Sequence, residues 1–579
     1  MKIYAYIKKA FASMKVAIQR FPITIVITTL VSFLLMYLAH QSSNLDSNVL
    51  TQLQRITMVL ALGIPLSLCI KRILEMKLSS IPLLFYAVGI LLLVLYYLFF
   101  LKDLSQLSII RYIAITLSLY IAFIFLPYGS TSSQDFELYT IRLGGRFFLT
   151  GIYAFILFLG LAGILFTIDK LLGIPFPSEL YLDVWILSIG IFAPTFFLAG
   201  VPKTSLSKIS FSYPHAFQVL LLYIVMPLLT IYTSILYIFF AKIILTHQWP
   251  EGLVAHLVLW YSMITTGVLF CIQSLRSKNK WVAIFYHWIS RLILPILVIM
   301  FMSIGIRIHE YGITSNRYFV ALAGIWVTGC MLYLTFTKKP KTIWLLISLS
   351  CLTFLSVWGP WSHKNISVIS QNHRLEKILT QNNMLKGNKI IPSTTVSQKE
   401  QVEVSQILSY FDRMYSLQDV HYVPSDFTIN QMEEIFGFPQ QSPYAFSNNY
   451  FYYHAIGNPT IISIQDYDYF IGFQNYYSST LSKNILNDVE VTYQPQEKVL
   501  TIIQNNKELY HTSLNKWGTQ LYQKYGTDKT EITTQDMTFY DENENIKISF
   551  VLSDIHGEVM KNNEIIINDI NFYILINIK

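Results

Sequence analysis

Residues 81–100 read IPLLFYAVGILLLVLYYLFF, twenty residues without a charged side chain. About 20 apolar residues in a helix span the roughly 30 Å of hydrocarbon in a bilayer, so this stretch predicts a transmembrane helix. It lacks the alternation of apolar and polar residues that is typical of a membrane β-strand. The whole chain of 579 residues is 53% hydrophobic and only 13% charged, whereas soluble domains carry about 25% charged residues. The sequence therefore predicts a membrane protein.

Ten further apolar runs resemble 81–100. We expect a polytopic α-helical membrane protein with about 11 transmembrane helices, forming a bundle over residues 1–361. Backbone groups in lipid must be satisfied within each segment, which is why every run is read as a helix. The other runs lie near residues 21–39, 54–70, 108–127, 147–166, 183–200, 216–241, 252–272, 284–306, 318–336 and 342–360.

The Lys and Arg residues near the ends of these runs predict the orientation. With the N-terminus in the cytoplasm, the inside segments hold eighteen basic residues and the outside loops hold six. This asymmetry follows the positive-inside rule. Eleven crossings would then place the C-terminal part outside the cytoplasm. Because the basic excess of residues 1–361 lies in short loops, we read it as a topology signal and expect no nucleic-acid partner.

Residues 362–579 have a more polar composition and predict an extracytoplasmic α+β domain. Their net charge is −8, from 16 Lys and Arg against 24 Asp and Glu. Helices are expected over 364–436, with a possible capping box at Ser397–Glu400 and a shorter helix that begins at Thr428–Gln431 and ends at Gly437. These leading helices are expected to pack on a mostly antiparallel β-sheet over 450–579. All four cysteines fall in predicted spans, so the domain has no disulfide.

Within 450–579 the period of apolar residues approaches two, which indicates strands. A helix near 513–525 is expected to interrupt them. The Tyr-rich stretch at 448–453 could stack on sugars, although aromatic residues at strand spacing more often fill a core. The strands are expected at 459–465, 467–474, 489–495, 498–504, 507–512, 547–553 and 563–577.

The segment RIHEYGITSNRY, residues 307–318, resembles a recurring motif of a bacterial membrane family catalogued as domain of unknown function 4153. The stretch SQNHRL at 370–375 is similar to a second part of that family. The resemblance covers roughly residues 20 to 575. It implies a multi-pass protein of the bacterial cytoplasmic (inner) membrane with unassigned activity, and it carries over no catalytic residue.

The 307–318 segment is also the main candidate polar site. Two guanidiniums flanking one carboxylate could bind the phosphate or carboxylate of a headgroup, with Glu310 as proton acceptor or orienting partner. The alternative is structural: Arg307 and Glu310 form a surface ion pair, Gly312 makes the turn and tyrosines anchor at the interface. The candidate residues of this segment are Arg307, His309, Glu310, Tyr311, Gly312, Thr314 and Arg317.

His287 and Arg291 are the second candidate site, because residues four apart share one helix face. An ionisable residue within a span is a functional hypothesis by default. Arg291 could instead snorkel to the surface or cap carbonyls freed by Pro295. Arg55 and Arg111 lie near the outer ends of their spans, and we expect both to snorkel.

Motifs of several enzyme classes are missing from the sequence. We find no phosphate-binding glycine loop, dinucleotide fingerprint, nucleophile elbow or zinc-protease motif. The twelve histidines are scattered, so no catalytic residue, cofactor or metal ligand is assigned.

Three functions stay open. The first is a non-enzymatic envelope protein whose exported domain senses or binds a partner, which could be an envelope protein, a lipid or a glycan. The second is a transporter or lipid-handling permease that uses Arg291 and the 307–318 loop. The third is a lipid-linked glycosyl or phospho-group transferase, by analogy of architecture only.

Overall fold

The structure is a computed structural model of the 579-residue chain. It divides the chain into two compact units, Met1–Arg374 with Phe411–Val420, and Leu375–Tyr410 with His421–Lys579. The first unit therefore extends beyond the expected boundary at 361 and takes up a later segment as well. The residues described are 12, 14–41, 45–76, 81–130, 133–172, 176–202, 213–246, 253–387, 389–441, 450–456, 464–473, 481–485, 489–505, 507–526, 530–560 and 564–579.

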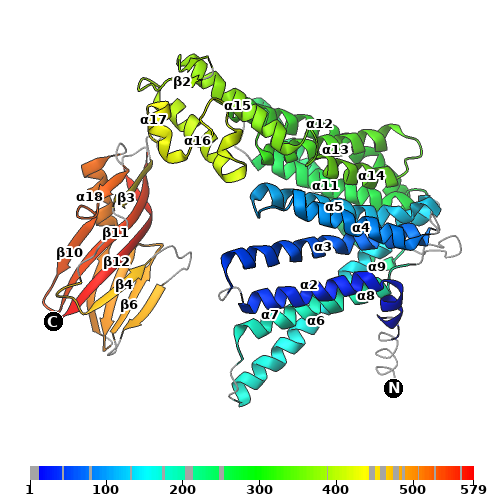
Figure 1. Ribbon diagram of the computed structural model, residues 1–579, viewed down its shortest axis with the longest axis horizontal. Helices are drawn as coiled ribbons and strands as arrows, with labels where there is room; N and C mark the ends of the chain where they lie inside the picture. The colour runs from blue at the N-terminus through cyan, green and yellow to red at the C-terminus, as the bar shows by residue number, and fades with distance from the viewer. Residues whose placement is uncertain are drawn as a thin grey trace. The chain divides into compact units, whose positions relative to one another are not determined.

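Long apolar helices build the first unit and run side by side (Figure 1). Two of them contain a π-helical turn, η2 and η4, and are continuous over Ser178–Ala199 and His215–Thr246. The elements are α2 (Pro22–Gln41), α3 (Ser47–Glu75), α4 (Pro82–Phe99), α5 (Gln106–Phe125), η1 (Leu126–Ser130), α6 (Ser133–Leu172), α7 (Ser178–Ile186), η2 (Leu187–Phe192), α8 (Ala193–Ala199), α9 (His215–Leu220), η4 (Leu221–Val225), α10 (Met226–Thr246), α11 (Leu253–Ile272), η5 (Gln273–Leu275), α12 (Lys280–Tyr311), α13 (Ser315–Phe336) and α14 (Ile343–Leu355).

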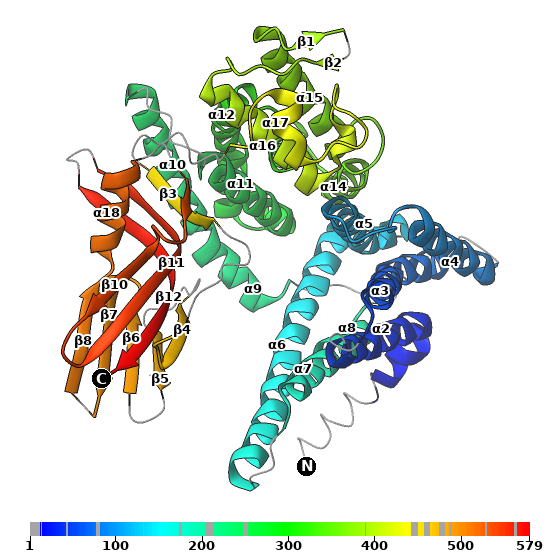
Figure 2. The same cartoon turned by 60° about the vertical axis from the view of Figure 1, so that its left-hand side comes forward.

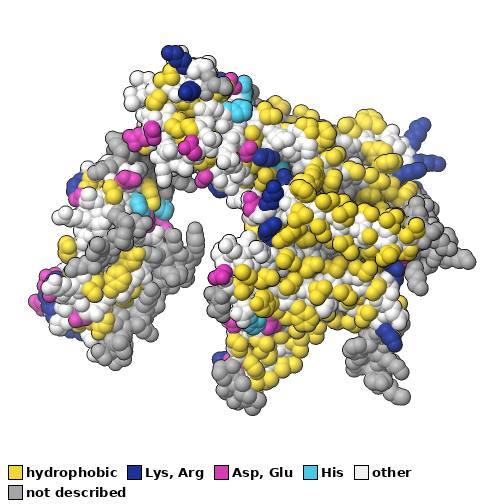
Figure 3. All heavy atoms as spheres, in the orientation of Figure 1, with side chains coloured by type: hydrophobic (Ala, Val, Ile, Leu, Met, Phe, Trp, Pro, Cys, Tyr) yellow, Lys and Arg dark blue, Asp and Glu magenta, His cyan; other side chains and the backbone are white. Residues whose placement is uncertain are grey.

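Among the described residues, ten helices are long and apolar enough to cross a membrane. They coincide with the first ten predicted runs. Many of their large apolar side chains point outward, such as Leu83, which is 80% exposed. Figure 3 shows hydrophobic side chains covering the visible face of these helices. Such a surface is stable when lipid surrounds it, so the unit is built as a multi-pass membrane protein.

The eleventh predicted run, 342–360, is a shorter helix than expected. α14 has 13 residues, or about 20 Å at 1.5 Å per residue, which is less than the hydrocarbon thickness. The helix ends before Gly359, whose φ of 76° lies in the left-handed region. Pro360 follows and disfavours helical backbone at the residue before it. The predicted length of this span was therefore wrong at its C-terminal end.

Two polar helices, α15 and α16, and several shorter elements follow the membrane helices. The capping box predicted at Ser397–Glu400 is supported, because the Glu400 amide donates to Ser397 Oγ at 3.4 Å. The short helix predicted after Thr428 is also present, and it begins with a capping box in which the Thr428 amide donates to Gln431 Oε1 at 2.9 Å. α15 and α16 each contain residues of both units. The elements are α15 (His363–Gln381), β1 (Leu385–Lys386), β2 (Lys389–Ile390), α16 (Gln398–Met414), η6 (Leu417–Asp419), η7 (Ile429–Gln431) and α17 (Met432–Phe436).

Two β-sheets, rather than one, form the C-terminal part (Figure 2). One sheet has the order β4-β12-β11-β3-β9 with β10 on β11, and the other has the order β5-β6-β7-β8. All pairs are antiparallel except β3 with β9. The elements are β3 (Tyr450–Ile456), β4 (Tyr469–Phe473), β5 (Leu481–Ile485), β6 (Val489–Gln494), β7 (Val499–Gln504), β8 (Lys507–Ser513), α18 (Asn515–Tyr525), β9 (Glu531–Thr533), β10 (Thr538–Glu542), β11 (Ile546–Val559) and β12 (Ile565–Ile578).

The two sheets share one apolar core. Its buried members include Val491 from β6, Phe550 from β11 and Trp517 from α18. In the described part of the chain no residue of α15–α17 belongs to this core, so the expected packing of the leading helices on the sheet was wrong. The physical reason is that each sheet has one apolar face, and a second sheet covers such a face as well as helices do.

The predicted strands around 467–474, 489–513 and 546–578 are confirmed, as is the helix α18. Residues 464 and 465 are not in a strand, and 459–463 lie outside the described residues. The strand β3 was missed within the Tyr-rich stretch. There Phe451 and Tyr453 are buried and belong to the core, as the structural reading of these aromatic residues expected.

Candidate functional site

The α12–α13 connection is a tight loop at the end of a long membrane helix. The Gly312 amide donates to the Ile308 carbonyl at 2.9 Å and closes the last turn of α12. Gly312 has a φ of 68°, a conformation that glycine adopts at helix C-termini without strain. A Cβ atom at this position would lie 2.8 Å from the side-chain amide of Gln371. Glycine is therefore required both by the turn and by the approach of α15.

The first turns of α15 bond to this loop. Gln371 Nε2 donates to the carbonyl oxygens of Tyr311 at 3.0 Å and Ile313 at 3.1 Å. The Ile313 amide in turn donates to Ser370 Oγ at 2.8 Å. Gln371 is 2% exposed, so these bonds replace water that the buried groups have lost. The two stretches with family resemblance, 307–318 and 370–375, thus contact each other.

Two guanidiniums cover the C-terminal end of α12. Arg317 Nη1 donates to the carbonyls of Gly312 at 2.9 Å and Tyr311 at 3.2 Å, and Arg374 Nη1 lies 3.4 Å from the Tyr311 carbonyl. Their guanidinium carbons lie 5.3 Å and 5.9 Å from the centre of the Tyr311 ring. Cations at a helix C-terminus are stabilised by the helix dipole and by its free carbonyl groups. This arrangement stabilises the loop itself.

A buried hydroxyl–imidazole cluster lies beside the loop. Ser315 Oγ is 3.1 Å from His363 Nδ1 and 2.7 Å from the Tyr415 hydroxyl. His363 is 1% exposed, and the Phe319 ring lies 5.2 Å from its ring. Burial, and secondly the charge of Arg111, lower the pKa of His363 to about 4. His363 is therefore neutral at physiological pH and serves as a hydrogen-bonding core residue.

Only part of the predicted polar site comes together. Tyr311, Gly312 and Arg317 form the loop described above, and Thr314 precedes α13. His309 and Glu310 are exposed and Arg307 is half-buried. Among the described residues neither Arg307 nor Glu310 has an ion-pair partner, so the surface ion pair between them is not formed.

His287 and Arg291 lie far from the loop on the same helix. Arg291 Nη1 donates to the carbonyl of His287 at 2.6 Å, and the His287 side chain is exposed. Twenty residues of α12 separate Arg291 from Tyr311, or about 30 Å of helix. Between them the buried residues of α12 are apolar except for Ser303. The two candidate sites are thus separated along α12 by a packed face that is almost entirely apolar.

An ion network that the sequence reading missed links α3 to Arg20 and α6. Arg20 Nε and Nη2 donate to the two carboxylate oxygens of Glu75 at 2.7 Å and 2.8 Å. Arg72, which is fully buried, donates to Glu75 at 3.1 Å, to the Pro202 carbonyl at 3.0 Å and to the Tyr139 hydroxyl at 2.8 Å. We call Arg20, Arg72, Glu75 and Tyr139 the Glu75 network. The spacing of Arg72 and Glu75 was a signal, but the basic residues were read for topology alone.

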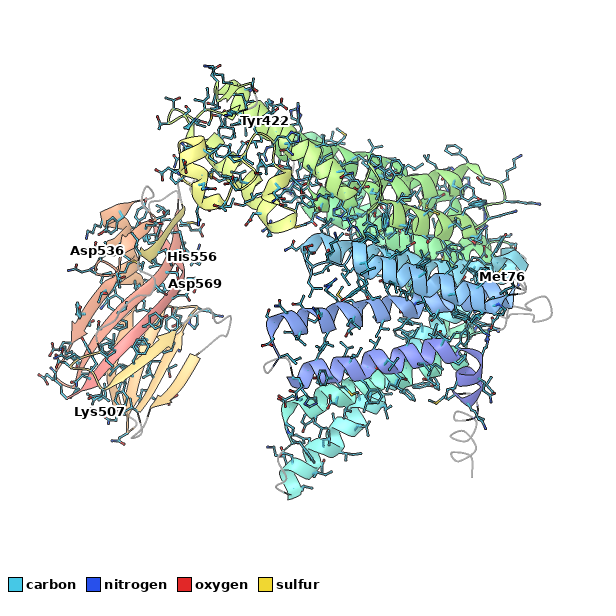
Figure 4. The ribbon with its side chains drawn as sticks, in the orientation of Figure 1. Met76, Tyr422, Lys507, Asp536, His556 and Asp569 are labelled. Atoms are coloured by element: carbon cyan, nitrogen blue, oxygen red, sulfur yellow. The ribbon has the colours of Figure 1, made fainter. Side chains whose placement is uncertain are left out.

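The C-terminal domain carries a polar patch on one face of its larger sheet. Asp554 Oδ1 accepts a hydrogen bond from the Tyr452 hydroxyl at 2.9 Å and lies 2.7 Å from His454 Nδ1. The strand register places His556 opposite Tyr452 and Asp569, on the same face; Figure 4 labels His556 and Asp569 on their neighbouring strands. We call these five residues the β11 patch. In the described parts of the chain, no three His, Cys, Asp or Glu side chains are arranged to hold a metal ion.

Comparison with known proteins places the chain in a family. It is 25% identical to the "Uncharacterized protein PM1469" of Pasteurella multocida (strain Pm70) over 249 residues. The aligned region covers 42% of this chain and 39% of that protein. The match thus spans less than half the length of this curated relative. No solved structure matches the chain. The profile described as "Domain of unknown function (DUF4153)" matches residues 23–388, which include α3 to α14, all but the first residue of α2, and the part of α15 that bonds to the loop. The chain therefore belongs to the DUF4153 family.

Proposed function

We propose that this protein is a non-enzymatic protein of the bacterial inner membrane, whose membrane unit carries an extracytoplasmic domain that binds an envelope partner. One observation carries the proposal. The polar groups of the Tyr311–Arg317 loop bond to α15, the helix that leads out of the membrane unit, instead of opening toward a ligand. The loop therefore holds the first part of α15 within the membrane unit.

The packing of α14 supports an eleventh crossing. α14 runs antiparallel to α5: Ile343 packs in one cluster with Phe123 near the end of α5, and Ser350 bonds to Ser118 at its middle. Val357, beyond the end of α14, packs beside the first half of α5. Since α5 is long enough to cross the membrane, a segment lying along its length crosses as well. Eleven crossings and the positive-inside rule support a cytoplasmic N-terminus and an exported C-terminal domain.

The β11 patch is the partner surface that we favour on the exported domain. The His454 side chain is 55% exposed, and Asp554 is 27% exposed. An open sheet face with tyrosine, histidine and carboxylate groups offers both donors and acceptors to a protein or a glycan. Tyr452, His454 and Asp554 are held by hydrogen bonds to each other, so little entropy of these side chains is lost on binding.

Thiol labelling tests the orientation. In a variant whose four native cysteines are replaced, a single cysteine is placed at Tyr540, which is 72% exposed in β10, or at Lys278 between α11 and α12. We expect a membrane-impermeant maleimide to label Tyr540→Cys in spheroplasts and Lys278→Cys only after lysis. Labelling of Tyr540→Cys only after lysis would overturn the exported placement.

Photo-crosslinking in cells tests partner binding. A photoreactive amino acid replaces His454 in the patch or, as a control, Tyr540 on a different strand. The proposal expects a defined adduct from position 454 that is absent from position 540 and is lost with Asp554→Ala. Cells expressing the chain at its native level without any adduct at 454 would count against binding by this face.

A further inference from the structure

Three side chains that each have a buried donor without a hydrogen-bond partner pack against Phe100, just after α4. Among the described residues, Tyr96 Oη, Arg111 Nε and Trp358 Nε1 are buried and have no hydrogen-bond partner. Phe100 contacts all three: its ring centre lies 5.9 Å from that of Tyr96, 4.4 Å from that of Trp358 and 5.4 Å from the Arg111 guanidinium carbon. Tyr96 is only 6% exposed. Buried polar atoms are nearly always satisfied, so three together call for an absent acceptor.

The guanidinium of Arg111 has no acid of its own in the described structure. Arg111 appears in none of the ion pairs there, and it lies 5.9 Å from the Trp358 ring. The Asp103 carboxylate accepts hydrogen bonds from Ser105 Oγ at 2.7 Å and Ser108 Oγ at 3.0 Å, and these bonds hold the pKa of Asp103 below its usual value. Asp103 acts on Arg111 electrostatically but forms no ion pair with it. The three donors therefore include a positive charge without a hydrogen-bonded acid among the described residues.

Arg55 shows what a purely structural arginine does in the same region. It donates to the carbonyls of Leu101 at 2.5 Å and Tyr97 at 3.5 Å, and it lies 4.5 Å above the Tyr97 ring. Its guanidinium thus caps the end of α4. Arg111 had been expected to snorkel, but its Nε is buried among aromatic rings and donates to nothing described. The two arginines differ because the buried Nε of Arg111 has no acceptor among the described residues.

We propose that Tyr96, Arg111 and Trp358 form a binding site for a phosphate group. The three groups offer hydrogen-bond donors and one positive charge, which matches the acceptor oxygens and negative charge of a phosphate. The rings of Phe100 and Trp358 suit the apolar part of an attached molecule. Arg111 lies five residues into α5, about 8 Å along the helix from its first residue. At that depth the phosphate of a lipid headgroup or a free phosphate ion can reach it.

Variants of the full chain test the site, because each removes one hydrogen-bond donor or the positive charge. Tyr96→Phe and Trp358→Phe delete the hydroxyl and the indole N–H, Arg111→Gln deletes the charge, and Tyr97→Phe is the matched control. The purified protein in neutral detergent is titrated with dioctanoyl-phosphatidylglycerol, with inorganic phosphate or with chloride, and its thermal midpoint is measured. Gel filtration verifies folding of each variant.

We expect the lipid or the phosphate ion, but not chloride, to raise the midpoint of the wild type and of Tyr97→Phe. Tyr96→Phe and Trp358→Phe weaken the apparent affinity about fivefold and Arg111→Gln at least about tenfold. A response to the lipid alone identifies a headgroup as the source, and a response to inorganic phosphate identifies the free ion. Equal responses in wild type and variants, or no response with a more stable Tyr96→Phe, overturn the site.

Discussion

Ser118 of α5 and Ser350 of α14 bond to each other in a reciprocal manner. Each hydroxyl oxygen lies within bonding distance of the other residue's carbonyl, at 3.0 Å and 2.9 Å, and the two hydroxyls are 3.0 Å apart. Both residues are buried. Small polar residues let membrane helices approach closely and bond across their interface. This pair therefore sets the distance and the register between α5 and α14.

Replacing Ser350 should separate two effects. Ser350→Ala loses the hydrogen bonds and should cost about 1 kcal/mol, whereas Ser350→Leu also forces the helices apart and should cost about 1–3 kcal/mol more. Unfolding in mixed micelles measures both. Ser234→Leu on the exposed side of α10 is the control. If Ser350→Leu is no worse than Ser234→Leu, α14 is not packed against α5 as described.

The membrane helices could be predicted because their signal is local. A run such as 81–100 contains its own evidence, and α4 begins and ends within a residue of it. The capping box at Ser397–Glu400 is equally local and was predicted. The prediction for the eleventh run was wrong only at its C-terminal end, before Gly359 and Pro360. Apolar composition alone does not show where such residues end a helix.

The candidate site could be predicted only in part because its partners are distant in sequence. The loop at Tyr311–Arg317 was recognised, but the groups that bond to it come from Ser370, Gln371 and Arg374. A cluster of polar residues bonds equally well to a ligand or to another helix. The ion pair of Glu75 could not be predicted either, because its partner Arg20 is 55 residues away. The division of the strands into two sheets likewise depends on pairings between distant segments.

Gln371→Glu should undock the start of α15. The variant replaces two donated hydrogen bonds by carboxylate oxygens that face the carbonyls of Tyr311 and Ile313. Unsatisfied buried groups cost about 1–3 kcal/mol each. We expect faster hydrogen exchange of the amides in 363–374, measured by mass spectrometry. His373→Ala, on the exposed side of the same helix, should leave exchange unchanged, and an unchanged Gln371→Glu would refute the docking.

Arg72→Met should destabilise the membrane unit strongly. It removes the donor to the Tyr139 hydroxyl and one of the two cations on Glu75, and it leaves the Pro202 carbonyl with Arg20 Nη2, 3.1 Å away, as its remaining donor. Breaking a buried ion network costs about 3–5 kcal/mol. Detergent-solubilised protein should lose thermal stability, while the half-buried neighbour Lys71→Met should not. Arg72→Met with Glu75→Leu should cost less than the sum of the two single changes, and strict additivity would show that they act independently.

Acidification should weaken the His363 cluster. His363 has a pKa of about 4 in the folded protein and about 6.5 when unfolded. Between these values the unfolded chain binds the extra proton, so the free energy of unfolding falls as pH drops from 6.5 toward 4, by at most about 3 kcal/mol. Above pH 7 the residue is neutral in both states and contributes no pH dependence.

Because other groups also titrate, the informative quantity is the difference in thermal midpoint between wild type and His363→Gln. We expect the thermal midpoint of the wild type to fall more steeply between pH 7 and pH 5 than that of His363→Gln, which cannot take up a proton at this position. Parallel pH profiles for the two proteins would mean that His363 is not buried beside Ser315 in a neutral state.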